Sequence, residues 1–124
     1  PAYDPAAAEP PPVEVTRGRF TLALDAWAYC WTPVGGEDGI CTDGAPAEVL
    51  EILPEDGPIT VSFPADFTFS AQVFDSAYET LIGEATVTKV DSGWEITPTN
   101  EGTAVIELFG KGPEGDVIVS FVIE

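Results

Sequence analysis

Three aromatic residues alternate along one short stretch of the chain and are the first candidates for chemistry: Trp27, Tyr29 and Trp31. Side chains two residues apart share one face of a β-strand, so this spacing predicts an aromatic row. On a protein surface such a row could stack against sugar rings, as in a carbohydrate-binding module. A bulge near Asp25 would instead turn the row inward, and burying large rings is worth more than burying the alanines between them. We therefore expect a core role first, a binding platform second and a protein-contact patch third.

Three acidic residues lie in or beside the glycine-containing loop that follows: Glu37, Asp38 and Asp43. Calcium takes six to eight oxygen ligands, so these carboxylates and the loop carbonyls are candidate calcium ligands. The spacing matches no EF-hand, and a chain this rich in Asp and Glu places carboxylates in most of its loops. We therefore expect a solvated acidic loop and no cofactor.

The two cysteines, Cys30 and Cys41, flank the same loop. Two cysteines in a β protein of secreted character predict one disulfide, which here would staple a long connection. A redox role is disfavoured because the spacing is not Cys-x-x-Cys and no basic neighbour is present to lower a thiol pKa.

The absence of histidine from the sequence excludes several kinds of active site. Histidine bases and histidine metal ligands are ruled out, and the serines have no evident activating group. Asp91-Ser92-Gly93 matches the triplet of aspartic proteases, yet a single copy would need homodimerisation and the same triplet is a common hairpin turn, so we expect a turn. We predict a non-catalytic protein, with a small acid hydrolase that uses only carboxylates as an open alternative.

The charge balance restricts the partners. The chain has 22 Asp and Glu against 4 Lys and Arg, a formal net charge of −18. Such a surface repels phosphate backbones and anionic lipids, so nucleic acid is disfavoured and a protein or polysaccharide partner is favoured. No apolar run approaches the roughly 20 residues of a membrane-spanning helix, so we expect no integral membrane segment.

The elements that position these candidate side chains are all predicted to be β-strands. Residues 1–12 are rich in Pro and Ala and should form an extended leader or tether, whereas residues 13–124 should form one β-sandwich domain. We count about seven to nine short alternating strands separated by turn residues, which is typical of an antiparallel sandwich. Residues 47–53 fit either a strand or a helical turn. The clearest alternation lies in residues 20–24, 59–63, 67–73, 81–90, 94–97, 103–109 and 117–123.

Two resemblances sharpen these expectations. Residues 98–108, where a Gly precedes an alternating strand, resemble the last-but-one strand of bacterial immunoglobulin-like modules, which implies an immunoglobulin-like sandwich. Tyr29-Cys30-Trp31, a Gly-containing loop and Cys41-Thr42-Asp43-Gly44 resemble a motif of small exported or lipid-anchored envelope proteins of actinobacteria. That second resemblance implies an extracellular or cell-surface location and is compatible with an upstream lipid anchor. It carries over no catalytic residue.

From these observations we expect a non-catalytic module for protein interaction or adhesion. A carbohydrate-binding module that uses Trp27, Tyr29 and Trp31 is the first alternative, and an acid hydrolase is the second.

Overall fold

The computed structural model describes residues 7–33, 35–36, 38–54, 57–98 and 102–124, and within these ranges all regular structure is β. Residues 7–12 belong to no strand. The strands are β1 (Val13–Arg17), β2 (Phe20–Leu24), β3 (Ala28–Trp31), β4 (Ile40–Asp43), β5 (Ile52–Leu53), β6 (Ile59–Ser62), β7 (Thr68–Phe74), β8 (Leu81–Val90), β9 (Gly93–Thr97), β10 (Ala104–Gly112) and β11 (Gly115–Ile123).

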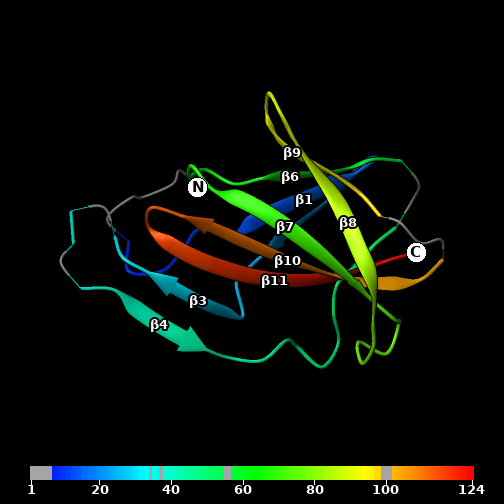
Figure 1. Ribbon diagram of the computed structural model, residues 1–124, viewed down its shortest axis with the longest axis horizontal. Coiled ribbons are helices and arrows are strands. Elements are labelled where there is room, and N and C mark those ends of the chain that lie inside the picture. The colour runs from blue at the N-terminus through cyan, green and yellow to red at the C-terminus, as the bar shows by residue number, and fades with distance from the viewer. Residues whose placement is uncertain (1–6, 34, 37, 55–56, 99–101) are drawn as a thin grey trace.

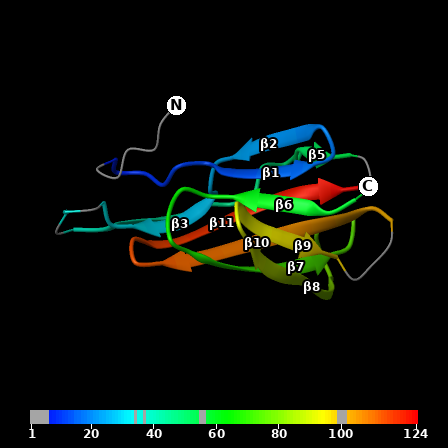
Figure 2. The same ribbon diagram turned by 90° about the horizontal axis from the view of Figure 1, so that it is seen from above.

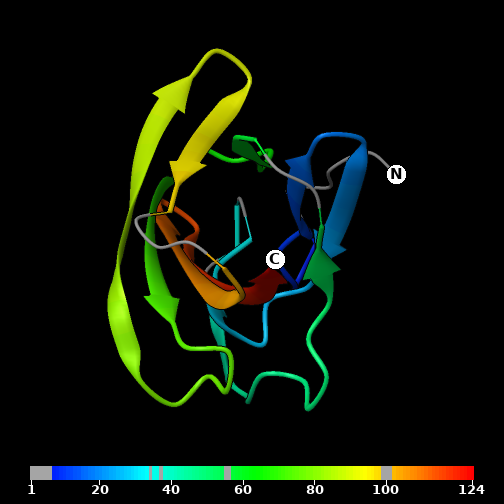
Figure 3. The same ribbon diagram turned by 90° about the vertical axis from the view of Figure 1, so that its right-hand side faces the viewer.

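The strands form one continuous sheet that curls into a half-barrel (Figure 1). Their order is β2-β1-β6-β9-β8-β7-β10-β11-β3-β4, with antiparallel neighbours throughout. β8 joins the two halves of the sheet, because Leu81–Ala85 pair with β7 and Thr86–Val90 pair with β9. Figure 3 shows the β8–β9 hairpin on one side of the curl and the β1–β2 hairpin on the other.

The all-β, antiparallel prediction is confirmed, whereas two finer expectations need correction. The sheet is not clearly a two-sheet sandwich, since hydrogen bonding continues through β8 from one half to the other. The expected strand number was too low, because the described residues contain 11 strands. Of residues 47–53, only Ile52–Leu53 form a strand, and this strand pairs in parallel with the end of β11 (Figure 2). That pairing is non-local, so no local pattern could predict it.

The core fills the concave side of the half-barrel, which we call the inner face. On β7, Phe69, Ala71 and Val73 are buried while Ser70 and Gln72 are exposed, as the alternation of small polar and apolar residues predicts. A chain of aromatic contacts links β3 to β9 through the core. Its ring-centroid distances are 5.7 Å for Trp31–Phe67, 4.9 Å for Phe67–Phe63, 5.7 Å for Phe63–Phe69 and 4.7 Å for Phe69–Trp94.

Gly110 of β10 makes room for one of these rings. It lies directly opposite Phe69 of β7, and a Cβ added at Gly110 would sit 2.6 Å from the Phe69 ring. A side chain there would force the ring to move, so the packing of Phe69 requires glycine at this position. None of the described segments is a helix of the length and hydrophobicity needed to cross a membrane.

Candidate functional site

The β structure is interrupted between β2 and β3, and this interruption decides where the aromatic residues point. Asp25, Ala26 and Trp27 belong to no strand. The indole Nε1 of Trp27 donates to Ser120 Oγ at 3.0 Å. Ser120 lies between the fully buried core residues Val119 and Phe121 on β11, so its side chain points to the opposite, outer face. Trp27 therefore lies on the outer face of the sheet.

Tyr29 and Trp31 point the other way. Tyr29 lies opposite the core residue Val117 and packs against the core, while Trp31 is 1% exposed and contacts Phe63 and Phe67. The interruption of the β structure at residues 25–27 thus places one ring on the outer face of the sheet and two against the core. The three predicted site residues do not form a common flat surface.

The predicted disulfide between Cys30 and Cys41 is present, and it joins directly opposite residues of β3 and β4. The backbone N–H of Cys30 also donates to the Asp116 carboxylate of β11 at 3.1 Å. β4 is an edge strand whose four residues are all exposed, so the disulfide fastens an edge that contributes nothing to the core.

The acidic loop carries no described metal site. Asp38 and Asp43 are exposed, and Glu37 lies outside the described residues. Among the residues that the structure describes, no three acidic or cysteine side chains come together in an arrangement that could hold a metal ion.

The structure instead brings four polar side chains into line across the outer face. Directly opposite residues in adjacent antiparallel strands share a face. Gln72 of β7 lies opposite Glu84 of β8 and, on its other side, opposite Glu107 of β10. Glu107 in turn lies opposite Ser120 of β11. We call this set the outer row: Glu84, Gln72, Glu107 and Ser120.

Tyr78, from the loop between β7 and β8, covers one end of the outer row. Its hydroxyl donates to Glu107 Oε2 at 2.5 Å and lies 2.8 Å from Ser120 Oγ, the atom that accepts the Trp27 indole N–H. Its ring packs edge-on against Phe74 at 5.0 Å between centroids. Burial, and next the hydrogen bond to Glu107, raise the pKa of Tyr78 to about 12, so the phenol stays neutral and donates.

Asp75 sets the conformation that delivers Tyr78. Its carboxylate accepts the backbone N–H groups of Glu79 at 2.8 Å and Thr80 at 3.2 Å, and these bonds lower the pKa of Asp75. Tyr78 has a positive φ of 59°, a region that costs a residue with a side chain about 1 kcal/mol or more. The contacts of the Tyr78 hydroxyl offset this cost.

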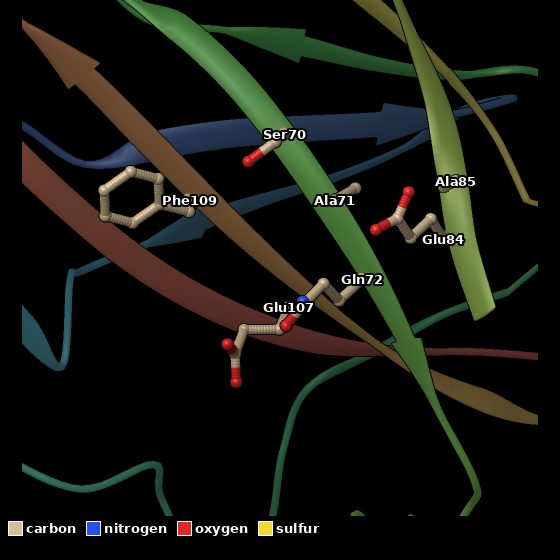
Figure 4. A pocket seen from close by; sticks show the side chains of 7 residues that line it. All are labelled: Ser70, Ala71, Gln72, Glu84, Ala85, Glu107 and Phe109. Carbon is tan, nitrogen blue, oxygen red and sulfur yellow. The ribbon is translucent and has the colours of Figure 1, made fainter. Parts of the chain in front are cut away.

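Two hollows open on either side of this network. The first, which we call the strand hollow, has a volume of about 460 Å³ over β7, β8 and β10 (Figure 4). Figure 4 shows the Glu84 carboxylate extending toward β7, whereas the Glu107 carboxylate turns away from Glu84, toward the Tyr78 end of the row. The side chains that can contact a ligand there are Ser70, Gln72, Glu84, Glu107 and Phe109.

The second, which we call the Trp27 hollow, has a volume of about 550 Å³. It lies between residues 25–27, which separate β2 from β3, and the irregular segment 45–51, and it also reaches Ser120. Alanines make up much of the remaining lining. The other side chains that bear on its chemistry are Asp25, Trp27, Val49, Leu50 and Glu51.

Both hollows combine an aromatic ring with two carboxylates, and among the described residues neither lining includes a lysine or arginine. This arrangement can attract a cation and pack against its apolar part. The sequence analysis missed the outer row because its members come from four strands. The polar positions within the alternating strands, such as Gln72 and Glu107, were the only local signal.

Comparison with protein-family models, with curated proteins and with solved structures found no match.

Proposed function

We propose that this chain is a non-catalytic interaction module that binds a cationic segment of a protein partner on the outer face of its sheet. The observation that supports this proposal is the outer row flanked by two hollows, each holding two carboxylates and an aromatic ring. The net charge of −18 adds long-range attraction for such a partner and speeds encounter.

The proposal gives the paired carboxylates a binding role. Glycoside cleavage needs two carboxyl groups that face each other across a bond, and Glu107 is instead hydrogen-bonded to Tyr78 and turned away from Glu84. A carboxylate held in this way is well suited to accept a cation.

A lysine-rich peptide tests the proposal on the full chain. We expect an alternating Gly-Lys peptide to bind, a Gly-Glu peptide of equal length not to bind, and the affinity to fall steeply with salt because exposed ion pairs are screened. The variants Glu84→Gln and Glu107→Gln should each weaken binding about two- to fivefold, as expected for exposed ion pairs. Calorimetric titration measures this directly.

Asp91→Asn is the matched control, because Asp91 is an exposed carboxylate in the turn between β8 and β9 and lines neither hollow. It should change the affinity less than twofold. Equal weakening by Asp91→Asn and Glu84→Gln would show that only net charge matters. No binding of the lysine peptide at low salt would overturn the proposal.

Carbohydrate binding is the second candidate function. Trp27 lines one hollow and Phe109 lines the other, each beside polar groups that could hydrogen-bond a sugar. A soluble neutral glucan in the same titration separates the two: saturable glucan binding that survives high salt would favour a carbohydrate-binding module.

We further propose an exported, cell-surface setting, in line with the resemblance of residues 29–44 to actinobacterial envelope proteins. The disulfide supports it, since such bonds persist in oxidising compartments. The relationship of this chain to immunoglobulin-like modules also stays a prediction. Thiol labelling of fractionated cells tests the setting: Cys30 and Cys41 should resist labelling unless a reductant is added.

A further inference from the structure

We propose that the Trp27 hollow is the specific subsite for one lysine side chain of the partner, with its methylene stem inside the hollow and its ammonium between Asp25 and Glu51. This inference deepens the interaction function proposed above and rests on it for the identity of the partner. Trp27, alanines, Val49 and Leu50 supply apolar contact, and the two carboxylates supply opposite charge.

The position of Trp27 is set before any ligand arrives. Its backbone N–H donates to the Ile118 carbonyl at 3.1 Å and its indole N–H donates to Ser120 Oγ at 3.0 Å. Ser120 is 6% exposed and is itself held by the Tyr78 hydroxyl. A residue whose backbone and ring are each held by a hydrogen bond loses little further freedom on binding, which favours affinity.

The charge around the hollow selects the ligand. An ammonium near an indole is attracted to the ring as well as to nearby carboxylates. Lys89 and Trp94 already make such a contact within this protein, with Nζ 4.1 Å from the ring centroid. The described lining of the Trp27 hollow contains no lysine or arginine, so a cation from outside complements it.

A side chain with both an apolar stem and a terminal charge fits this lining better than a charge alone. Val49 is 87% exposed on the segment between β4 and β5, so it is available to contact a methylene chain. A lysine side chain, or n-butylammonium as its free equivalent, combines the two requirements.

Nuclear magnetic resonance with n-butylammonium chloride tests the subsite directly. The three tryptophans give three indole N–H signals, and the signal absent from Trp27→Phe identifies Trp27. We expect n-butylammonium to shift the Trp27 indole signal saturably, together with backbone signals of residues 45–51. Ammonium chloride lacks the methylene stem and n-butanol lacks the charge. Neither should therefore produce a saturable shift of these signals over the same concentration range.

Neutral variants of the two carboxylates should weaken the binding of both n-butylammonium and the lysine peptide. Asp25→Asn and Glu51→Gln should each lower the affinity about fivefold, the upper end for an exposed ion pair. Glu48→Gln is the matched control, because Glu48 is an exposed carboxylate on the same segment but is not part of the lining. It should change the affinity less than twofold.

The two proposals fail in different ways. If the lysine peptide binds but Glu51→Gln has no more effect than Glu48→Gln, the subsite is wrong and the interaction function stands. If n-butylammonium binds beside Trp27 but the lysine peptide does not bind, the subsite stands and the protein-partner function is wrong. If n-butylammonium shifts no signal near Trp27, the subsite proposal is overturned.

Discussion

Tyr78 makes several of the contacts that order the outer face. It adopts a backbone conformation that few residues with a side chain adopt, and its hydroxyl connects Glu107 of β10 to Ser120 of β11. Through Ser120 it also supports the indole of Trp27. The residue that orders the outer face thus comes from a turn that shows no site signal in the sequence.

Removing the Tyr78 hydroxyl should destabilise the fold measurably. We expect Tyr78→Phe to lower the free energy of unfolding near neutral pH by about 1–2 kcal/mol, because Glu107 and Ser120 lose a half-buried hydrogen-bond partner. Tyr29→Phe is the control, since the described residues offer its hydroxyl no hydrogen bond. Urea denaturation measures both, and equal losses in the two variants would argue against the network.

Comparing wild type with Tyr78→Phe at different pH values should reveal the raised pKa of Tyr78. The folded pKa of about 12 lies above the ordinary value of 10.0, so the unfolded chain loses the phenol proton first. The stability that this group contributes is therefore complete below pH 10 and disappears as the pH rises through 12. The difference in unfolding free energy between wild type and Tyr78→Phe should shrink over this range. A difference that stays constant would contradict the assignment.

At the scale of elements, β4 is the strand least tied to the core. Its residues are exposed, and it is held by pairing with β3 and by the Cys30–Cys41 disulfide. Its neighbour β3, in contrast, inserts Trp31 into the aromatic core. Loss of the disulfide should therefore loosen the edge and leave the rest of the sheet paired.

We expect the double variant Cys30→Ala, Cys41→Ala to lose about 2–3 kcal/mol of stability, the chain-entropy value for a closed loop of this size. Hydrogen exchange should accelerate at β4 amides while β10 and β11 amides keep their relative protection. Reductant should bring wild type to the same state and leave the variant unchanged. Equal acceleration in all strands would contradict a locally fastened edge.

For the whole molecule, the net charge of −18 is the dominant electrostatic property. Like charges on a compact chain repel each other, and unfolding moves them apart. The aromatic contacts from Trp31 to Trp94 join both halves of the sheet through the core and oppose this repulsion.

Salt should accordingly stabilise the protein. Between about 0.01 M and about 1 M sodium chloride the Debye length falls from about 30 Å to about 3 Å, so self-repulsion is screened. We expect the urea midpoint to rise at pH 7. Near the isoelectric point of about 4.1 the same salt change should have little effect. Midpoints at pH 7 that do not respond to salt would contradict this expectation.

The sequence by itself determined the all-β class, most strand positions and the disulfide, because alternation, turn residues and paired cysteines are local signals. The strands at 68–74, 81–90 and 115–123 follow the predicted alternation closely. Only the tertiary structure decided that Trp27 points outward while Tyr29 and Trp31 point inward, because a break of three residues changes the face. It alone also assembled Glu84, Gln72, Glu107 and Ser120, since strand order and register bring together residues that no sequence spacing relates.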